Sequence, residues 1–236
     1  MNLEVNILLI TAASIGVIHT ALGPDHYIPF IALSKSENWT NLKTSIITLI
    51  CGVGHVFSSI IIGVAGFIVG ASLFSLEAIE SFRGDIAGWL LIAFGLIYTI
   101  WGIKQSYKNK VHSHIHYHQD GIGHTHSHNH ASDHSHVHTS KGKKITPWLV
   151  FIIFILGPCE PLIPLLIYPA SNYNIVAVIA VASVFSIVTL ATMQIMVFVG
   201  IYGLNFFPIQ KIQNHIHTLA GISILFCGMS IQFFGL

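Results

Sequence analysis

The stretch IHTALGPDHYIP (residues 18–29) places ionisable side chains inside an apolar run that extends over residues 5–33. His19, Asp25 and His26 would therefore lie in a membrane-spanning helix, where no water solvates them. Ionisable residues at membrane depth are costly, and they indicate a functional site by default. The stretch thus predicts both a membrane fold and the place of its site.

Six apolar runs extend this interpretation to the whole chain. They cover residues 5–33, 46–74, 86–103, 148–169, 175–204 and 218–236. The 236 residues are 53% hydrophobic and only 8% charged, whereas about a quarter of the residues in a soluble domain are charged. Because a helix needs roughly 20 apolar residues to cross the hydrocarbon core, we expect an all-α polytopic membrane protein with six transmembrane helices.

The basic residues predict the orientation. With the N-terminus outside, all 10 Lys and Arg except Arg83 fall in connections on the cytoplasmic side, as the positive-inside rule requires. Residues 75–85, which carry Glu77, Glu80, Arg83 and Asp85, are expected to form a mostly acidic outer loop. We therefore expect both termini outside the cytoplasmic membrane. The opening MNLEVN has no basic residue, so no cleaved signal peptide is expected.

The two halves of the chain resemble each other. LGPDHYIP (residues 22–29) returns as LGPCEPLIP (residues 156–164). Small residues of the third and sixth runs match at a constant offset of 133: Ala87, Gly88, Gly95 and Gly102 correspond to Ala220, Gly221, Gly228 and Gly235. We interpret these glycines as helix-packing surface.

Three runs in each half predict two repeats of opposite orientation, an arrangement typical of transporters with a midplane site. The first repeat would span residues 1–104, a cytoplasmic loop 105–145, and the second, inverted repeat 146–236. Pro24 and Pro158 remove a backbone donor each, so both repeats should begin with a broken helix. Carbonyl groups that lose their hydrogen bond at membrane depth must be satisfied by neighbouring protein or by water in a cavity. The two breaks therefore predict a cavity between the halves.

Imidazoles and a carboxylate near the first break predict a metal site. On a continuous helix His19 and His26 would lie about 10 Å apart along the axis, and the break could shorten this distance and turn Asp25 to the same point. His55, in GVGHVFSS, supplies a third imidazole. Such nitrogen-rich sets suit nickel, copper, zinc and iron. The alternative is that these are isolated polar residues that hydrogen-bond between helices.

Cys159 and Glu160 occupy the second-half positions that match Asp25 and His26. They could complete the metal site with a thiolate or carboxylate, or Glu160 could carry a coupling proton. A buried thiol beside a hydrogen-bonded acid is an equally good interpretation.

Residues 112–138 hold 11 of the 16 histidines. Tracts of this kind bind metal ions and need not pack. We expect the loop to raise the local metal concentration or to sense metal, outside the permeation path. Its candidate ligands are His112, His114, His116, His118, His124, His126, His128, His130, His134, His136 and His138.

HTALGPDH resembles the His…Asp-His signature of the nickel/cobalt transporter superfamily, in the Gly-Pro-Asp-His form of its urease-accessory-like and sulfite-exporter-like branches. GPCEPLIPLL is similar to the Gly-Pro-Cys motif of the same branches. The resemblance implies transition-metal transport, and its motif corresponds to His19, Asp25 and His26. Five residues separate His19 from Asp25, one more than in the best-known nickel permeases.

We therefore expect a secondary transporter of Ni²⁺ or Co²⁺, with Zn²⁺ as a further cargo and with the direction open. No GxxxxGK[ST] phosphate loop is present, so ATP use is not expected. Protonation of Asp25 or Glu160 could couple transport to the proton gradient. No enzymatic activity, no permanently bound cofactor and no nucleic-acid partner are expected, and the surroundings should be membrane lipid.

Three other functions stay open. An exporter of sulfite or another small anion would need basic residues or helix N-termini, and no Lys or Arg lies within the predicted spans. A membrane thiol-disulfide conduit of the cytochrome c biogenesis type also has paired helix breaks, but it needs two thiols, and Asp25 stands where the first cysteine would be. A membrane-anchored metal buffer would leave the intramembrane acid unexplained.

Overall fold

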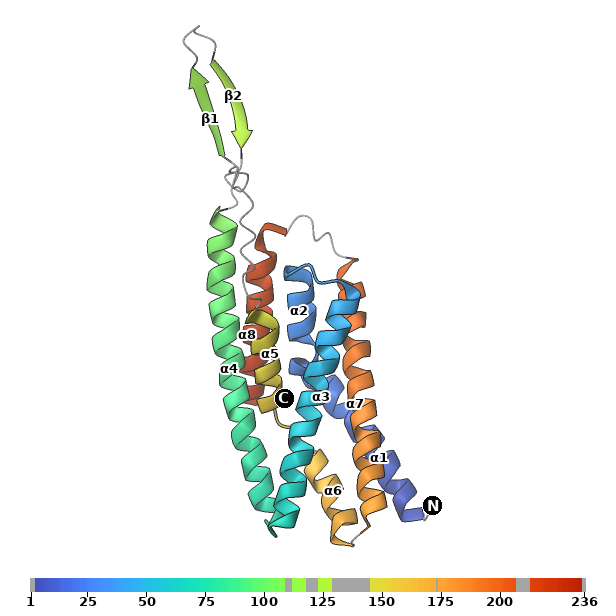
Figure 1. Cartoon of the computed structure of the whole chain (residues 1–236). Helices are drawn as coiled ribbons and strands as arrows, with labels where there is room; N and C mark the ends of the chain where they lie inside the picture. Colours follow the sequence, from blue (N-terminus) through green and yellow to red (C-terminus); the bar gives the residue numbers. More distant parts are fainter. Residues whose placement is uncertain are drawn as a thin grey trace.

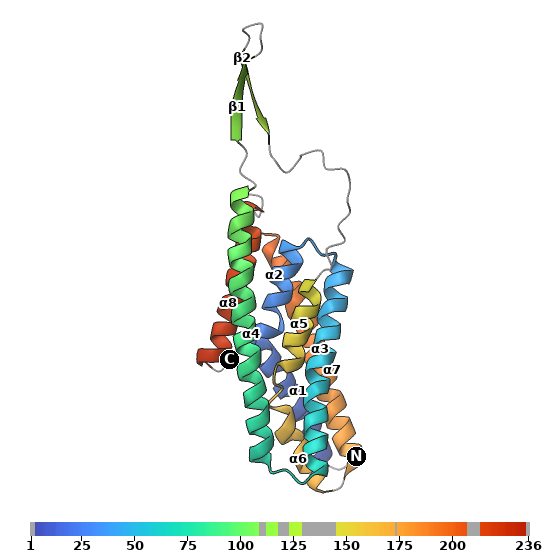
Figure 2. The ribbon, with the colours of Figure 1, turned by 60° about the vertical axis from the view of Figure 1, so that its left-hand side comes forward.

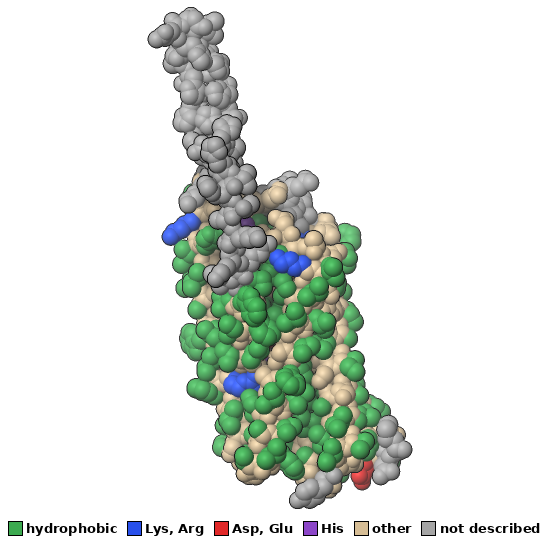
Figure 3. Space-filling view, in the orientation of Figure 1, with side chains coloured by type: hydrophobic (Ala, Val, Ile, Leu, Met, Phe, Trp, Pro, Cys, Tyr) green, Lys and Arg blue, Asp and Glu red, His purple; other side chains and the backbone are tan. Residues whose placement is uncertain are grey.

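The computed structural model describes residues 3–108, 112–117, 123–128, 145–172, 174–206 and 213–234. In this part of the chain the architecture is a helical bundle (Figure 1). Five helices are long and apolar enough to cross a membrane: α1 (Leu3–Leu22), α3 (Asn41–Ile68), α4 (Leu73–Lys108), α7 (Ile175–Leu204) and α8, which follows the short η4 (Gln213–His215) and spans Ile216–Phe234. The face seen in Figure 3 is mostly hydrophobic. The chain is therefore a membrane protein with several apolar helices.

The break predicted at Pro24 is confirmed. α1 ends at Leu22, Gly23 has extended backbone angles, and Pro24 opens a single 3₁₀ turn, η1 (Pro24–His26). α2 (Ile28–Ser36) then continues toward the end of the bundle where α3 begins (Figure 1). Proline fits this position because the first residue of a helix needs no backbone donor.

A second break interrupts the other half. α5 (Ile145–Leu156) stops before Gly157 and Pro158, and α6 (Leu162–Ser171) starts after Pro161. Each of these helices is shorter than the roughly 20 residues that cross a bilayer. They lie one after the other along the bundle (Figure 1), so the break predicted at Pro158 is also confirmed.

The predicted acidic loop before the third run is wrong. α4 begins at Leu73, so Glu77, Glu80, Arg83 and Asp85 lie within a long helix. The expectation that no Lys or Arg lies in a span fails for the same reason. The two charges that lie inside the bundle, Glu80 and Arg83, pair with each other, while Glu77 and Asp85 are exposed.

The histidine-rich segment departs from the all-α prediction. Two strands, β1 (His112–Tyr117) and β2 (Gly123–His128), form an antiparallel pair in which histidine opposes histidine at three positions. Their sequences, HSHIHY and GHTHSH, place histidine at every second residue, which is the period of a strand. His118, His130, His134, His136 and His138 lie outside the described residues.

Glycines join α4 to α8, which lie side by side (Figures 1 and 2). A Cβ on Gly95 would lie 2.4 Å from the Leu225 amide nitrogen, and one on Gly228 would lie 2.8 Å from the Ile92 amide nitrogen. The predicted packing role is thus confirmed for these glycines, while Gly235 lies outside the described residues. The two contacts are related by the sequence offset, since 92 and 95 plus 133 give 225 and 228.

Candidate metal centre

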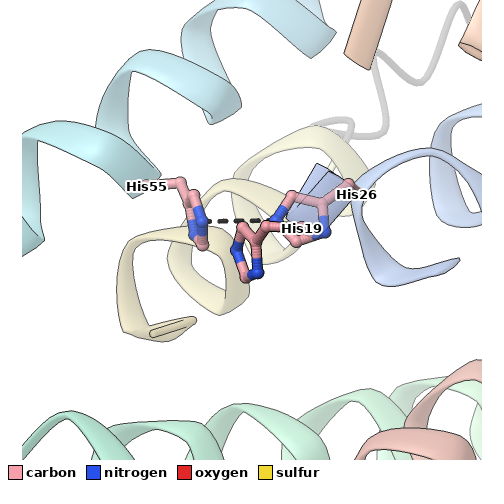
Figure 4. A group of neighbouring side chains, drawn as sticks. All are labelled: His19, His26 and His55. Carbon is pink, nitrogen blue, oxygen red and sulfur yellow. Dashed lines mark hydrogen bonds between the residues drawn. The ribbon is translucent and has the colours of Figure 1, made fainter. Parts of the chain in front are cut away.

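The three predicted histidines come together. His19 lies in the last turn of α1, His26 lies in η1, and His55 comes from the middle of α3 (Figure 4). The ring centroids of His19 and His26 are 4.9 Å apart, and those of His26 and His55 are 5.0 Å apart. An unbroken helix would separate His19 from His26 by about 10 Å. The Gly-Pro break therefore makes the cluster.

Hydrogen-bond acceptors hold the Nδ1 side of the His26 ring. Its Nδ1 lies 3.0 Å from Asp25 Oδ1 and 3.1 Å from the Gly23 carbonyl oxygen. Both atoms are acceptors, so Nδ1 carries the proton and Nε2 keeps its lone pair. Among the described residues, Asp25 is not part of the group whose ligand atoms converge. Its carboxylate contacts the His26 ring, as the partners that orient ligating histidines do, and its role as a ligand stays a prediction.

His55 is arranged in the same way. Its Nδ1 faces the Phe154 carbonyl oxygen at 3.4 Å, which leaves Nε2 as an acceptor. The Nε2 atoms of His26 and His55 face each other at 3.4 Å, along the dashed line in Figure 4. With the ring protons on both Nδ1 atoms, two lone pairs at this distance would repel each other, and a proton or a metal ion between them removes the repulsion. Zinc-type bonds of about 2.1 Å at tetrahedral angles separate two nitrogens by about 3.4 Å.

His19 supplies the third ring. Its Nε2 is buried and has no hydrogen-bond partner among the described residues, which is uncommon for a buried polar atom. The ligand atoms of the three histidines lie within 4.8 Å of one another. One ion with bonds of about 2.1 Å reaches nitrogens up to about 4.2 Å apart, so a small rotation of the His19 ring would complete the set.

Both Gly-Pro glycines pack against these rings. A Cβ on Gly23 would lie 2.5 Å from His26 Nδ1, and one on Gly157 would lie 3.2 Å from His55 Nδ1. The first distance leaves no room for a side chain. Gly23 is therefore needed by the site as well as by the break.

The cluster opens into a cavity of about 420 Å³. Its walls come from α1, η1, α3, α4, α8 and the α5–α6 break, and they carry the three histidines together with Asp25, Asp85 and Glu160. Among the described residues, no Lys or Arg lines it. A carboxylate-lined cleft with low-dielectric walls concentrates cations.

Cys159 and Glu160 have different places. Glu160 lies on the cavity wall, while Cys159 is fully buried and packs with Leu162 and Phe185 in an apolar cluster. Neither belongs to the described group of converging ligand atoms. Glu160 therefore lies on the wall of the cavity beside the three histidines, and Cys159 lies in the apolar core next to it.

Two charged residues that the sequence interpretation placed in a loop support the second break. The side chain of Glu80 is completely buried and forms an ion pair with Arg83. Glu80 Oε2 accepts hydrogen bonds from Ser59 Oγ at 2.9 Å and from the Cys159 amide at 3.0 Å. A carboxylate therefore satisfies the amide that the break exposes.

Arg83 satisfies the carbonyl side of the same break. Its Nη2 donates to the Ile155 carbonyl at 2.6 Å and to the Gly157 carbonyl at 3.4 Å. It also donates to Ser58 Oγ at 2.6 Å, one turn beyond His55. The signal that could have revealed the pair is the spacing of three between opposite charges, which places them on one helix face.

The family is shown by comparison with known proteins. Residues 28–230 match the family described as the cytochrome c biogenesis protein transmembrane region, well over half of the chain. The chain belongs to this family. No match was found among curated proteins or solved structures. The family differs from the nickel/cobalt transporter superfamily that the HTALGPDH motif resembles, so that resemblance stays a prediction.

Proposed function

We propose that this member of the family is a secondary transporter of divalent transition metal ions, Ni²⁺ or Co²⁺, with Zn²⁺ as a further cargo. The observation that carries the proposal is the 3.4 Å separation of the His26 and His55 Nε2 atoms. Each ring turns its Nδ1 to an oxygen acceptor, so both lone pairs point at the space between the rings. Neutral imidazole nitrogen is a preferred ligand of these metals.

The cavity favours a cation as cargo. Asp25, Asp85 and Glu160 line it, and Arg83 is held by Glu80 and the carbonyl oxygens of the break. An anion site would need an available cationic group or a helix N-terminus aimed into the cavity. The carboxylates on the cavity wall therefore disfavour sulfite or another small anion as cargo. Asp25 or Glu160 could take up a coupling proton.

For the architecture we propose six membrane crossings in two inverted repeats, with α1–α2 and α5–α6 each forming one broken crossing. The matched Gly-Pro breaks support this arrangement, as does the duplicated contact between α4 and α8. The lysine distribution favours termini outside and the histidine-rich hairpin in the cytoplasm. Transporters of this construction bind their cargo where the broken helices meet.

A thiol-disulfide conduit is the second candidate, because the family description names cytochrome c biogenesis. Such a conduit must shuttle a pair of thiols. Cys51, Cys159 and Cys227 are the three cysteines of the chain, and all three are free and buried. Asp25 also replaces a thiol at the first break, so the metal proposal accounts for more of the site.

The test is the flux of radioactive nickel and cobalt into proteoliposomes that contain the full chain. His26→Ala should lower flux at limiting metal by more than about 100-fold, since loss of a mere outer-shell partner already costs 10 to 100-fold in affinity. His215→Ala, an exposed histidine outside the cavity, is the matched control and should transport normally. Equal flux through the wild type and His26→Ala would contradict the proposed site.

The same proteoliposomes distinguish the second candidate. A conduit should show Cys159 alternating between labelled and protected states when reductant is added on one side, with no metal flux. A metal transporter should show flux without any change in the redox state of Cys159.

A further inference from the structure

The two sides of the histidine cluster are unlike each other. On one side the cavity reaches Ser81 and Asp85 in the first half of α4. On the other side the side chains of Phe30 and Phe154 close the path, with exposures of 0% and 5% and ring centroids 4.7 Å apart. The site is therefore accessible from the end where α4 begins and closed toward the end where α8 begins.

A polar cluster ties three helices together beyond this closed side. Tyr98 Oη of α4 donates to Glu37 Oε1 at 2.8 Å and lies 3.0 Å from Ser36 Oγ at the end of α2. It also lies 3.1 Å from His217 Nδ1 in the first turn of α8. The single hydroxyl hydrogen of Tyr98 serves Glu37, so the phenol oxygen is left as an acceptor for His217 Nδ1 and for Ser36 Oγ, which also lies 3.5 Å from the Leu33 carbonyl oxygen. The cluster is thus a closed hydrogen-bond network between α2, α4 and α8.

The repeat relation connects this cluster to the open cavity. The offset of 133 that relates the two α4–α8 glycine contacts also carries Gly84 to His217 and Tyr98 to Ile231. Gly84 and Ile231 line the open cavity, and their counterparts His217 and Tyr98 hold the closed network. The same positions of the two repeats therefore face an open passage at one end and a hydrogen-bonded closure at the other.

We propose that the network of Ser36, Glu37, Tyr98 and His217 is the closed gate of a second access route to the histidine site. The proposal deepens the transport function and rests on it. When the gate opens, the hydrogen bonds of Tyr98 break and α8 separates from α2 at this end. Glu37 and His217 then face the passage and offer a carboxylate and an imidazole to a passing divalent cation.

The gate can be tested by thiol labelling without any metal, so its result is independent of the flux experiment. Leu91 is 3% exposed and lines the open cavity, and its counterpart in the second repeat, Ile224, is 0% exposed. Each is replaced by cysteine in the full chain after Cys51, Cys159 and Cys227 are changed to alanine. A membrane-impermeant maleimide is then added to right-side-out or inside-out vesicles.

Leu91→Cys should be labelled from one face only, and Ile224→Cys should be protected from both. Adding Tyr98→Phe, which removes only the hydroxyl, should raise the labelling rate of Ile224→Cys from the opposite face by at least about fivefold, the factor that corresponds to one lost hydrogen bond. Glu37→Gln should act in the same direction. Tyr168→Phe, at an exposed tyrosine of α6, is the control and should change nothing.

Retained one-sided labelling of Leu91→Cys shows that each variant is folded. The proposal is overturned if Ile224→Cys stays protected in both gate variants, if it becomes labelled from the same face as Leu91→Cys, or if Tyr168→Phe has an equal effect.

Discussion

The residues around His26 show how a short sequence motif specifies one atom. Gly23 gives the ring room, because a Cβ there would lie 2.5 Å from its Nδ1. Pro24 starts a new turn, and the Asp25 carboxylate and the Gly23 carbonyl oxygen accept hydrogen bonds from the Nδ1–H group of His26. Each residue of Gly-Pro-Asp-His therefore has a task, and together they direct the Nε2 lone pair of His26 toward His55.

Asp25→Asn tests this division of tasks. The amide is neutral and a weaker partner for the imidazole, so nickel affinity should fall by about 10 to 100-fold, as for other outer-shell partners of histidine ligands. The measurement is equilibrium nickel binding to the purified protein, with the hairpin retained in all variants so that its contribution cancels.

Asp85→Asn is the matched control, since Asp85 also lines the cavity but its hydrogen bond goes to Gln232 of α8 and not to a histidine ring. It should lower affinity only through the loss of one cavity charge. Equal losses in the two variants would show that Asp25 acts through its charge alone and does not orient His26.

At the scale of elements, the two helix breaks are supported differently. The first is short, and its carbonyl oxygens are used by the next turn and by His26. The second spans Gly157–Pro161 and depends on α4, whose Arg83 donates hydrogen bonds to carbonyl oxygens and whose Glu80 accepts one from an amide. The charges match the helix dipole, with a cation at the C-terminal end of α5 and an anion at the following amide.

Arg83→Met should destabilise the protein strongly, because it leaves the buried Glu80 carboxylate without its partner. Removal of one member of a buried ion pair costs about 3–5 kcal/mol. Glu80→Gln combined with Arg83→Met should cost less than the sum of the two single changes. Reversible unfolding in mixed micelles measures both quantities.

Lys35→Met provides the comparison for this prediction. Lys35 makes an exposed hydrogen bond to Asn205, and an exposed polar pair contributes at most about 1 kcal/mol. Similar losses for Arg83→Met and Lys35→Met would mean that the α5–α6 break does not need its charged support.

The sequence predicted the breaks but not their supports. Proline changes the backbone wherever it stands, so Pro24 and Pro158 could be interpreted without knowledge of the neighbours. Glu80 and Arg83 were assigned to a loop because a hydropathy window counts charges without knowing that they pair. The contact between Asp25 and the His26 ring could not be predicted, because the direction of a side chain in a single 3₁₀ turn does not follow from spacing along the chain.

The β1–β2 hairpin also depends on neighbours that the sequence does not reveal. The sequence analysis treats its histidines as a loop, although their alternation over residues 112–117 and 123–128 also fits paired strands. Pairing depends on register between two segments, and composition alone carries no register.

On the scale of the whole molecule, the α4–α8 interface is where the two halves meet. Ile92 and Gly95 on α4 face Gly228 and Leu225 on α8, and these four positions exchange under the offset of 133. A contact that maps onto itself is what the proposed inverted repeats would produce, because a two-fold axis exchanges equivalent positions. Close backbone approach at small residues stabilises such helix pairs in lipid.

This relation makes a quantitative prediction for Gly95→Ala and Gly228→Ala. Each new Cβ would meet the backbone of the partner helix, at 2.4 Å and 2.8 Å respectively, and a backbone cannot rotate away as a side chain can. Each variant should therefore lose about 1–3 kcal/mol of stability through overpacking, and the two losses should be similar.

Gly203→Ala is the control, since its Cβ would meet nothing within 4 Å and alanine favours the helix by about 0.5–1 kcal/mol. Thermal unfolding in detergent measures all three. A large loss at Gly95 with none at Gly228 would mean that the two contacts are not equivalent, and the two-fold relation that maps the open cavity onto the Tyr98 network would fail with them.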